Sequence, residues 1–162
     1  MTSRHPIRLQ VNGQAYEGHV EARKTLVDFL REDLRLTGTH VGCEHGVCGA
    51  CTIRLNGHTV RACLLFAVQA DGAALETVEG LARDDRWHPL QQAFHEHHAL
   101  QCGYCTPGML LAALELLEDN PQPSEQEIRL GIAGNLCMCT GYVNIVRAIK
   151  AAAARLHSAP LQ

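Results

Sequence analysis

The sequence has few aromatic residues and no long apolar run. Aromatic residues make up 4% of the 162 residues, so a hydrophobic core must be built mainly from leucine, valine, isoleucine and alanine. The longest apolar run, "MLLAAL" at residues 109–114, is far shorter than the about 20 residues that a helix needs to span a membrane. The first residues, "MTSRHPIRLQV", contain neither an apolar stretch nor a small-residue cleavage site. These absences predict a cytoplasmic protein with no membrane span.

Charge of one sign is also scarce. The chain has 14 lysine and arginine residues against 17 aspartate and glutamate residues, which gives a formal net charge of −3. Nucleic-acid-binding domains usually show a basic patch or stripe, so we expect no nucleic-acid partner. Hydrophobic residues make up 46% of the chain and charged residues 19%, values typical of a globular protein. The length allows one ordinary domain or two small ones.

Cysteine, in contrast, is abundant and concentrated. Seven of the eight cysteines lie in three short stretches, "CEHGVCGAC" at 43–51, "QCGYC" at 101–105 and "CMC" at 137–139. An even number of cysteines is compatible with a disulfide scaffold. Disulfides are rare in a reducing cytosol, however, where clustered thiols indicate metal binding or catalysis. Metal binding is therefore the favoured interpretation.

The first set has the spacing Cys43-x4-Cys48-x2-Cys51, followed by Cys63. C-x4-C-x2-C…C is the plant-type spacing for a [2Fe–2S] cluster held by four thiolates. The loop that surrounds such a cluster needs close approaches and unusual backbone angles, which glycine permits. Three glycines supply them, and we place them among the cofactor-binding residues: Gly42, Gly46 and Gly49. Four cysteines can also bind zinc, but structural zinc sites commonly use two short pairs.

The second set is Cys102-x2-Cys105, followed after 31 residues by Cys137-x-Cys139. Each pair precedes a predicted helix start, at Thr106 and at Thr140 respectively. The positive end of a helix dipole stabilises thiolates and an anionic cluster. With the first set in the same chain, a second iron–sulfur cluster is the favoured interpretation.

The hydrophobic pattern divides the chain into two halves. Residues 1–78 alternate like strands around two hairpin turns, Asn12-Gly13 and Asn56-Gly57. Between the turns, residues 25–34 have a helical pattern that begins with a capping-box-like Thr25. The pattern predicts an α+β domain, a small sheet wrapped over one helix.

Residues 79–157 instead show helical periodicity. Four helices are predicted, and they would form a compact bundle; the patterns cover residues 88–98, 106–119, 124–134 and 140–156. Residues 70–85 are the expected connection, and residues 158–162 form a tail. The acidic residues Glu115, Glu118 and Asp119 are expected to lie on a solvated helix face.

The motifs "CEHGVCGAC", "QCGYCTPGM" and "GNLCMCTGY" together resemble those of the iron–sulfur subunit of the molybdenum hydroxylase (xanthine oxidase) family. The resemblance covers about residues 5–157. It implies a plant-ferredoxin-like β-grasp domain followed by a four-helix-bundle [2Fe–2S] domain. In length the chain resembles the separate small subunit of three-subunit bacterial enzymes, such as carbon monoxide, nicotine, quinoline and aldehyde dehydrogenases.

The resemblance also implies roles for particular residues. It assigns Cys43, Cys48, Cys51 and Cys63 to the cluster nearer flavin, and Cys102, Cys105, Cys137 and Cys139 to the cluster nearer molybdenum. Gln101 matches the glutamine that hydrogen-bonds the pterin of the molybdenum cofactor, and Cys139 lies beside that pterin. Gly103 is placed with them among the cofactor-binding residues. Met138 departs from the family, which usually has arginine there, and the loss of this cation would lower the potential of the cluster.

By this resemblance the chain would pass single electrons from a molybdenum–pterin centre to FAD through its two clusters. The partners would be a large molybdenum-cofactor subunit, with the cofactor in its cytosine dinucleotide form, and a medium FAD subunit. They would form a heterotrimer or its dimer. The sequence leaves two alternatives open: a stand-alone two-cluster electron carrier or redox sensor, and a zinc-stabilised interaction module.

A few further residues have two interpretations. Tyr104, Met109 and Tyr142 lie next to the cluster motifs and could face a partner subunit or the core. His95 and His98, three residues apart, could bind a metal but more commonly such histidines are solvated.

Overall fold

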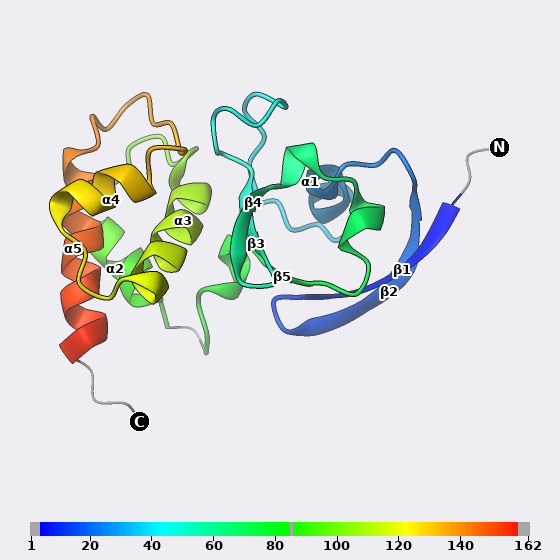
Figure 1. Cartoon of the computed structure of the whole chain (residues 1–162), viewed down its shortest axis with the longest axis horizontal. Helices are drawn as coiled ribbons and strands as arrows, with labels where there is room; N and C mark the ends of the chain where they lie inside the picture. Colours follow the sequence, from blue (N-terminus) through cyan, green and yellow to red (C-terminus); the bar gives the residue numbers. More distant parts are fainter. Residues whose placement is uncertain (1–3, 85, 159–162) are drawn as a thin grey trace.

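The computed structural model describes residues 4–84 and 86–158. A five-stranded mixed sheet and a group of four helices lie side by side along the long axis of the molecule (Figure 1). The order of strands in the sheet is β2-β1-β5-β3-β4. The strands are β1 (Arg4–Val11), β2 (Gln14–Glu21), β3 (Thr52–Leu55), β4 (His58–Arg61) and β5 (Ala74–Glu76).

Both predicted hairpins are confirmed. β1 pairs antiparallel with β2 around Asn12 and Gly13, whose φ angles are 52° and 80°. β3 pairs antiparallel with β4 around Asn56 and Gly57, with φ angles of 51° and 88°. Such positive φ angles at both central residues are what a two-residue hairpin turn needs. β5 joins the hairpins, parallel to β1 and antiparallel to β3.

The helix between the hairpins is present, but it is only partly α-helical. α1 (Leu26–Asp28) continues directly as the π-helical segment η1 (Phe29–Asp33). The predicted cap is confirmed, since the Asp28 amide donates to Thr25 Oγ1 at 3.2 Å. Leu26, Phe29 and Leu30 are fully buried beneath the sheet. Three short 3-10 segments complete this half: η2 (Ala62–Leu64), η3 (Ala67–Ala70) and η4 (Val78–Gly80).

The four predicted helices of the second half are confirmed. They are α2 (Pro89–Glu96), α3 (Thr106–Asp119), α4 (Glu125–Gly131) and α5 (Val143–Ser158). The predicted start of α3 at Thr106 is confirmed, with Cys105 as its N-cap residue. The predicted start of α5 is wrong: the helix begins three residues after Thr140 because Gly141 and Tyr142 adopt φ angles of 65° and 66°.

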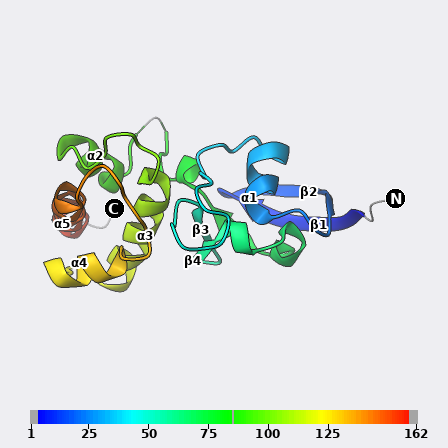
Figure 2. The same cartoon turned by 90° about the horizontal axis from the view of Figure 1, so that it is seen from above.

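Each half has its own hydrophobic core. One is built around β1, β3 and α1, and the other around the faces that α2, α3, α4 and α5 turn toward one another. α3 is the helix that packs against β3 and β4 (Figure 2). Apart from Ser158, the predicted tail at 158–162 lies outside the described residues. Over the ranges that the structure describes, no helix has the length and hydropathy to cross a membrane.

Candidate iron–sulfur centres

The first thiol set gathers at the open end of the β3–β4 hairpin. Cys43 and Cys48 lie in the loop between η1 and β3, Cys51 directly precedes β3, and Cys63 lies in η2 directly after β4. The hairpin register pairs Thr52 with Arg61, and the Ala62 amide donates to the Cys51 carbonyl at 3.2 Å. The β3–β4 hairpin therefore brings Cys63 back to the loop that contains the other three cysteines.

The surroundings of these thiols differ in polarity. The Cys48 amide donates to Cys43 Sγ at 3.4 Å, and this hydrogen bond is the main cause that lowers the pKa of Cys43 to about 6. Cys51 is 2% exposed, and burial raises the pKa of its thiol to about 11. A half-buried Cys43 thiolate that accepts an amide hydrogen bond and the buried Cys51 sulfur are thus combined in one loop.

The glycines in and beside this loop serve different needs. Gly46 and Gly49 have φ angles of 82° and 76°, which L side chains rarely adopt. Gly42 has no such angle, but a Cβ there would lie 3.0 Å from Cys48 Sγ. A Cβ on Gly49 would collide with the carbonyl oxygen of Gly134 in the other half of the molecule. Gly49 is therefore needed for its backbone angle and also for the approach of the two halves.

The second thiol set is assembled from two loops of the helical half. Cys102 and Cys105 lie between α2 and α3, and Cys137 and Cys139 lie between α4 and α5. The Sγ atoms of Cys139 and Cys102 are 3.6 Å apart, and those of Cys137 and Cys139 are 4.0 Å apart. Burial, followed by the neighbouring thiols, raises the pKa of Cys105 to about 12.

Cys137 is held by hydrogen bonds to residues that follow it. Its Sγ lies 3.0 Å from Thr140 Oγ1, and its amide donates to the Tyr142 hydroxyl at 2.8 Å. Burial acts to raise the pKa of this thiol, but hydrogen bonds, chiefly from Thr140 and also from Cys139 and Cys105, outweigh it and lower the pKa to about 7. Hydrogen bonds to a ligand sulfur are one of the ways in which a protein adjusts the potential of a cluster.

The residues present fit two iron–sulfur clusters. All eight cysteines are free thiols, which is contrary to the disulfide alternative. Thiolate sulfur is the ligand type that selects zinc, copper(I) and iron–sulfur clusters. Beside Cys105, the Thr106 hydroxyl is buried and has no partner among the described residues, so a sulfur atom of a cluster would supply an acceptor. Across the same residues, no three His, Cys, Asp or Glu side chains are grouped to hold a single ion.

The residues predicted to face the pterin lie on the surface. Gln101 is exposed and directly precedes Cys102, and Gly103 has a φ of 79° with open space around it. Met138 is fully exposed, at 101%. Tyr104 is half-exposed, as an interface residue would be, whereas Met109 is fully buried and belongs to the core of the bundle.

Several residues at the junction between the two thiol sets were not found from the sequence. Asn135 is 3% exposed, and its side-chain amide donates to the Gly49 carbonyl at 3.0 Å and to Thr52 Oγ1 at 3.1 Å. Arg61 donates to the Gly134 carbonyl at 2.6 Å. The only signal for Asn135 is its position two residues before Cys137, which does not indicate burial.

A second junction joins the segment before Cys43 to the loop that contains Cys102 and Cys105. The Tyr104 hydroxyl donates to the Val41 carbonyl at 2.6 Å, and His40 Nδ1 lies 2.8 Å from the Tyr104 carbonyl oxygen. The two rings stack with centroids 4.7 Å apart. Cys43 and the Cys102–Cys105 loop are therefore tied together as well.

Comparisons with known proteins agree with this geometry. Residues 9–82 match the model of a 2Fe-2S iron-sulfur cluster binding domain, and residues 77–150 match that of a [2Fe-2S] binding domain. The chain is 58% identical to the caffeine dehydrogenase subunit gamma of Pseudomonas sp. (strain CBB1), over 91% of this chain and 90% of that protein.

Solved structures show the same fold. A chain of quinoline 2-oxidoreductase from Pseudomonas putida 86 superposes with a TM-score of 0.93 and 48% identity, over 98% of this chain and 99% of that one. Aldehyde oxidoreductase from Desulfovibrio desulfuricans ATCC 27774 superposes with a TM-score of 0.91 and 44% identity, over 94% of this chain but 17% of that one.

The fold and the two thiol sets define a two-cluster iron–sulfur protein, a ferredoxin-like domain followed by a helical [2Fe–2S] domain. More particularly, the chain belongs to the iron–sulfur small subunits of the molybdenum hydroxylase (xanthine oxidase) family. It is thus an iron–sulfur subunit of an oxidoreductase and does not fall in the class of zinc-stabilised interaction modules.

Proposed function

We propose that this chain passes single electrons from a molybdenum–pterin centre on a large partner subunit to FAD on a medium partner subunit. The names of the relatives support this proposal, because they describe subunits of dehydrogenases and oxidoreductases. In this proposal the three subunits form a heterotrimer or its dimer in the cytoplasm. The boundary between the two cluster domains of this chain falls between residues 78 and 79.

Two groups of four thiolates would hold the clusters. These are Cys43, Cys48, Cys51 and Cys63 for the cluster nearer FAD, and Cys102, Cys105, Cys137 and Cys139 for the cluster nearer molybdenum. A [2Fe–2S] cluster supplies one-electron chemistry when bound. The chain itself orients the sulfurs, with the Cys48 amide directed at Cys43 and the Thr140 hydroxyl next to Cys137. It also excludes water at Cys51, which is almost fully buried.

A hydrogen bond between the two cluster loops is the observation that carries the proposal. The Leu136 amide donates to the Cys48 carbonyl at 2.8 Å. Cys48 belongs to the first thiol set, and Leu136 is covalently bonded to Cys137 of the second. One hydrogen bond therefore completes an otherwise covalent path from a ligand residue of one cluster to a ligand residue of the other.

The exposed end of the second set is the proposed contact with the pterin. Cys102, which follows Gln101, approaches Cys139 to 3.6 Å between sulfurs, which supports a shared contact surface for Gln101 and Cys139. A side-chain amide can donate and accept hydrogen bonds, so Gln101 suits the mixed edge of a pterin. The cofactor on the partner would be the cytosine dinucleotide form, and Met138 would meet it without a positive charge.

Co-purification with the products of the neighbouring genes tests the proposal. We expect a tagged chain to bring down molybdenum and FAD, together with about four iron and four sulfide per chain. In the reduced complex, the magnetic interaction between molybdenum and an iron–sulfur cluster should disappear in C102S/C105S and persist in C43S/C48S. If neither molybdenum nor FAD accompanies the chain, the subunit assignment is wrong and a stand-alone carrier is favoured.

A further inference from the structure

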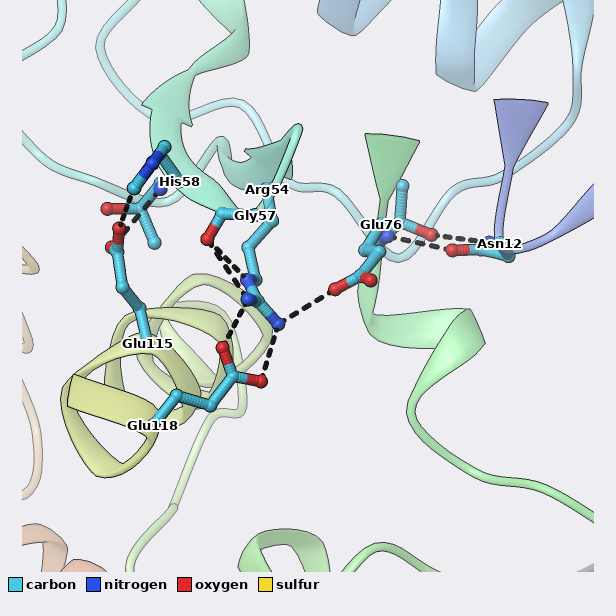
Figure 3. Close-up of polar contacts among 9 residues, drawn as sticks. Asn12, Arg54, Gly57, His58, Glu76, Glu115 and Glu118 are labelled. Carbon is cyan, nitrogen blue, oxygen red and sulfur yellow. Dashed lines mark hydrogen bonds and ion pairs between the residues drawn. The ribbon is translucent and has the colours of Figure 1, made fainter. Parts of the chain in front are cut away.

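The face of the sheet that meets the helical half contains a buried charge. Within β3, Ile53 is fully buried in the core of the first half, so the neighbouring residues Thr52 and Arg54 point to the opposite face. Thr52 contacts Asn135 there. The Arg54 side chain is 7% exposed and is directed at α3 (Figure 3).

All five N–H groups of Arg54 have acceptors. Nε and one terminal nitrogen donate to the Gly57 carbonyl at 3.1 and 3.0 Å. The other terminal nitrogen donates to Glu76 at 2.9 Å and to Glu118 at 3.0 Å, and a second contact makes the pairing with Glu118 bidentate. A bidentate arginine–carboxylate pair fixes direction as well as distance.

These partners come from both halves and from the connection between them. Gly57 lies in the β3–β4 turn, Glu76 ends β5 where the chain leaves the sheet, and Glu118 lies near the end of α3. On the same side of α3, Glu115 accepts from the Thr59 amide at 3.1 Å. Glu115 and Glu118 therefore join the two halves. Glu118 and Asp119 are exposed, as predicted, whereas the Glu115 side chain is only 22% exposed and its predicted placement was wrong.

α3 is held to the sheet at two separated points. Near its start, a Cβ on Gly108 would collide with the Gly49 carbonyl of the first cluster loop. Ten residues later, about 15 Å along the helix, Glu118 is bound by Arg54. Contacts at one point only would allow the helix to rock on the sheet, whereas two points fix its direction.

We propose that Arg54 is a positioning residue that keeps the two cluster loops at a fixed separation. It fixes the end of α3 close to the chain connection, and the hydrogen bond between Leu136 and Cys48 lies toward the other end. Without Arg54, this end of α3 would keep the contact between Glu115 and the Thr59 amide but lose the pairing of Glu118. The resulting motion of this end would open the junction between the cluster loops at the other end. This inference rests on the proposed two-cluster relay and adds the residue that holds its geometry.

The test compares Arg54→Met with Arg129→Met in the full chain with both clusters. Arg129 pairs with Glu125 within α4, on the surface and away from the sheet, so it controls for the loss of an ion pair. In Arg54→Met, we expect the amide of Leu136 to exchange its hydrogen about tenfold faster, because the junction that protects this amide opens more often. Glu118 and Glu76 lose their partner but are half-exposed and can rehydrate, so we expect the variant to fold. Amides of the β1–β2 pair and of α5 should not change.

A second readout is the magnetic interaction between the two reduced clusters. It should weaken and become heterogeneous in Arg54→Met while the signal of each cluster and the iron content stay as in Arg129→Met. If Leu136 exchange and the interaction are the same in both variants, the proposal is overturned.

Glu118→Gln is the back-up variant if Arg54→Met does not fold, because it leaves the contacts of Arg54 with Gly57 and Glu76 in place. It should change both readouts in the same direction, and no change would again overturn the proposal.

Failure of this inference can be distinguished from failure of the proposed function. The exchange and magnetic measurements use the chain alone, whereas the functional proposal is tested by the presence of molybdenum and FAD. If the readouts are unchanged but co-purification succeeds, only the positioning role of Arg54 is rejected. If the readouts change but neither molybdenum nor FAD co-purifies, the positioning role of Arg54 stands and the subunit assignment is rejected.

Discussion

Gly49 and Gly103 show how one backbone conformation can have two different costs when the residue is changed. Both have φ angles near 80°, at 76° and 79° respectively. Nothing lies within 4 Å of a Cβ on Gly103, whereas a Cβ on Gly49 would meet the Gly134 carbonyl and the Cα of Asn135. At Gly103 only the backbone preference opposes a side chain, and at Gly49 the other half of the molecule opposes it as well.

We therefore expect Gly49→Ala to be far more damaging than Gly103→Ala. Backbone strain alone costs about 1 kcal/mol, which lowers the melting temperature of a protein of this size by about 2–4 °C. Gly49→Ala should lower it by about 10 °C, since strain and displacement of the junction together cost about 3 kcal/mol. Thermal unfolding followed by circular dichroism measures both variants, and equal shifts would contradict the role of Gly49 at the junction.

The candidate ligand residues could be predicted from the sequence because the spacing between the cysteines of each set is a property of the sequence itself. Asn135 and Arg54 could not, because their roles depend on partners 83 and 64 residues away, Thr52 and Glu118. The ion pair of Glu118 with Arg54 was missed for the same reason. A carboxylate on a helix is usually solvated, and only the packing of α3 on the sheet reveals its arginine.

α4 begins with two reciprocal hydrogen bonds between Ser124 and Glu127. The Ser124 amide donates to Glu127 at 2.7 Å, and the Glu127 amide donates to Ser124 Oγ at 3.3 Å. These two bonds form a capping box, and the hydrogen bond from Ser124 lowers the pKa of the Glu127 carboxyl. α4 precedes the segment that contains Asn135 and Cys137, so its start contributes to the placement of the second thiol set.

Ser124→Ala should cost about 1 kcal/mol of unfolding free energy, the usual value for the loss of an N-cap. Gln126→Ala is the matched control, because Gln126 is exposed on the same helix turn and does not cap it. The comparison can be made by denaturant unfolding of the two variants in parallel. A loss in Gln126→Ala as large as in Ser124→Ala would show that the cap is not the cause.

Helix existence was easier to predict than helix bounds. Apolar periodicity identified all four helices of the second half, because each has a buried face. The start of α5 was missed because the positive φ angles of Gly141 and Tyr142 delay it, and they accompany the hydrogen bonds that Thr140 and Tyr142 make with Cys137. Local sequence preference does not show such a tertiary requirement.

The molecule as a whole consists of two cores, each with its own thiol set. The first core includes Cys51, and Cys63 packs against it, whereas Cys105 and Cys137 pack against the second. Each cluster would therefore stabilise mainly the half that surrounds it. The junction between the halves is polar and built from hydrogen bonds, so it does not merge the two cores into one.

This separation predicts that one cluster can be removed without the other. In C102S/C105S, studied as the chain alone, we expect about two iron atoms per chain and an unchanged signal from the cluster of the first half. C43S/C48S should show the converse. Iron analysis with low-temperature magnetic spectroscopy measures both. Loss of all iron from either variant would mean that the two halves fold only together.

The hydrogen bond from Leu136 to Cys48 limits which halves of homologous subunits can be combined. Its donor and acceptor are backbone groups, so any residue except proline at position 136 can donate it. Its neighbours have stricter requirements: position 49 must lack a side chain so that the loops can approach, and position 135 needs the asparagine amide that donates to Gly49 and Thr52. A hybrid that joins the first half of one homologue to the second half of another should conduct between its clusters only when this glycine and this asparagine are inherited as a pair.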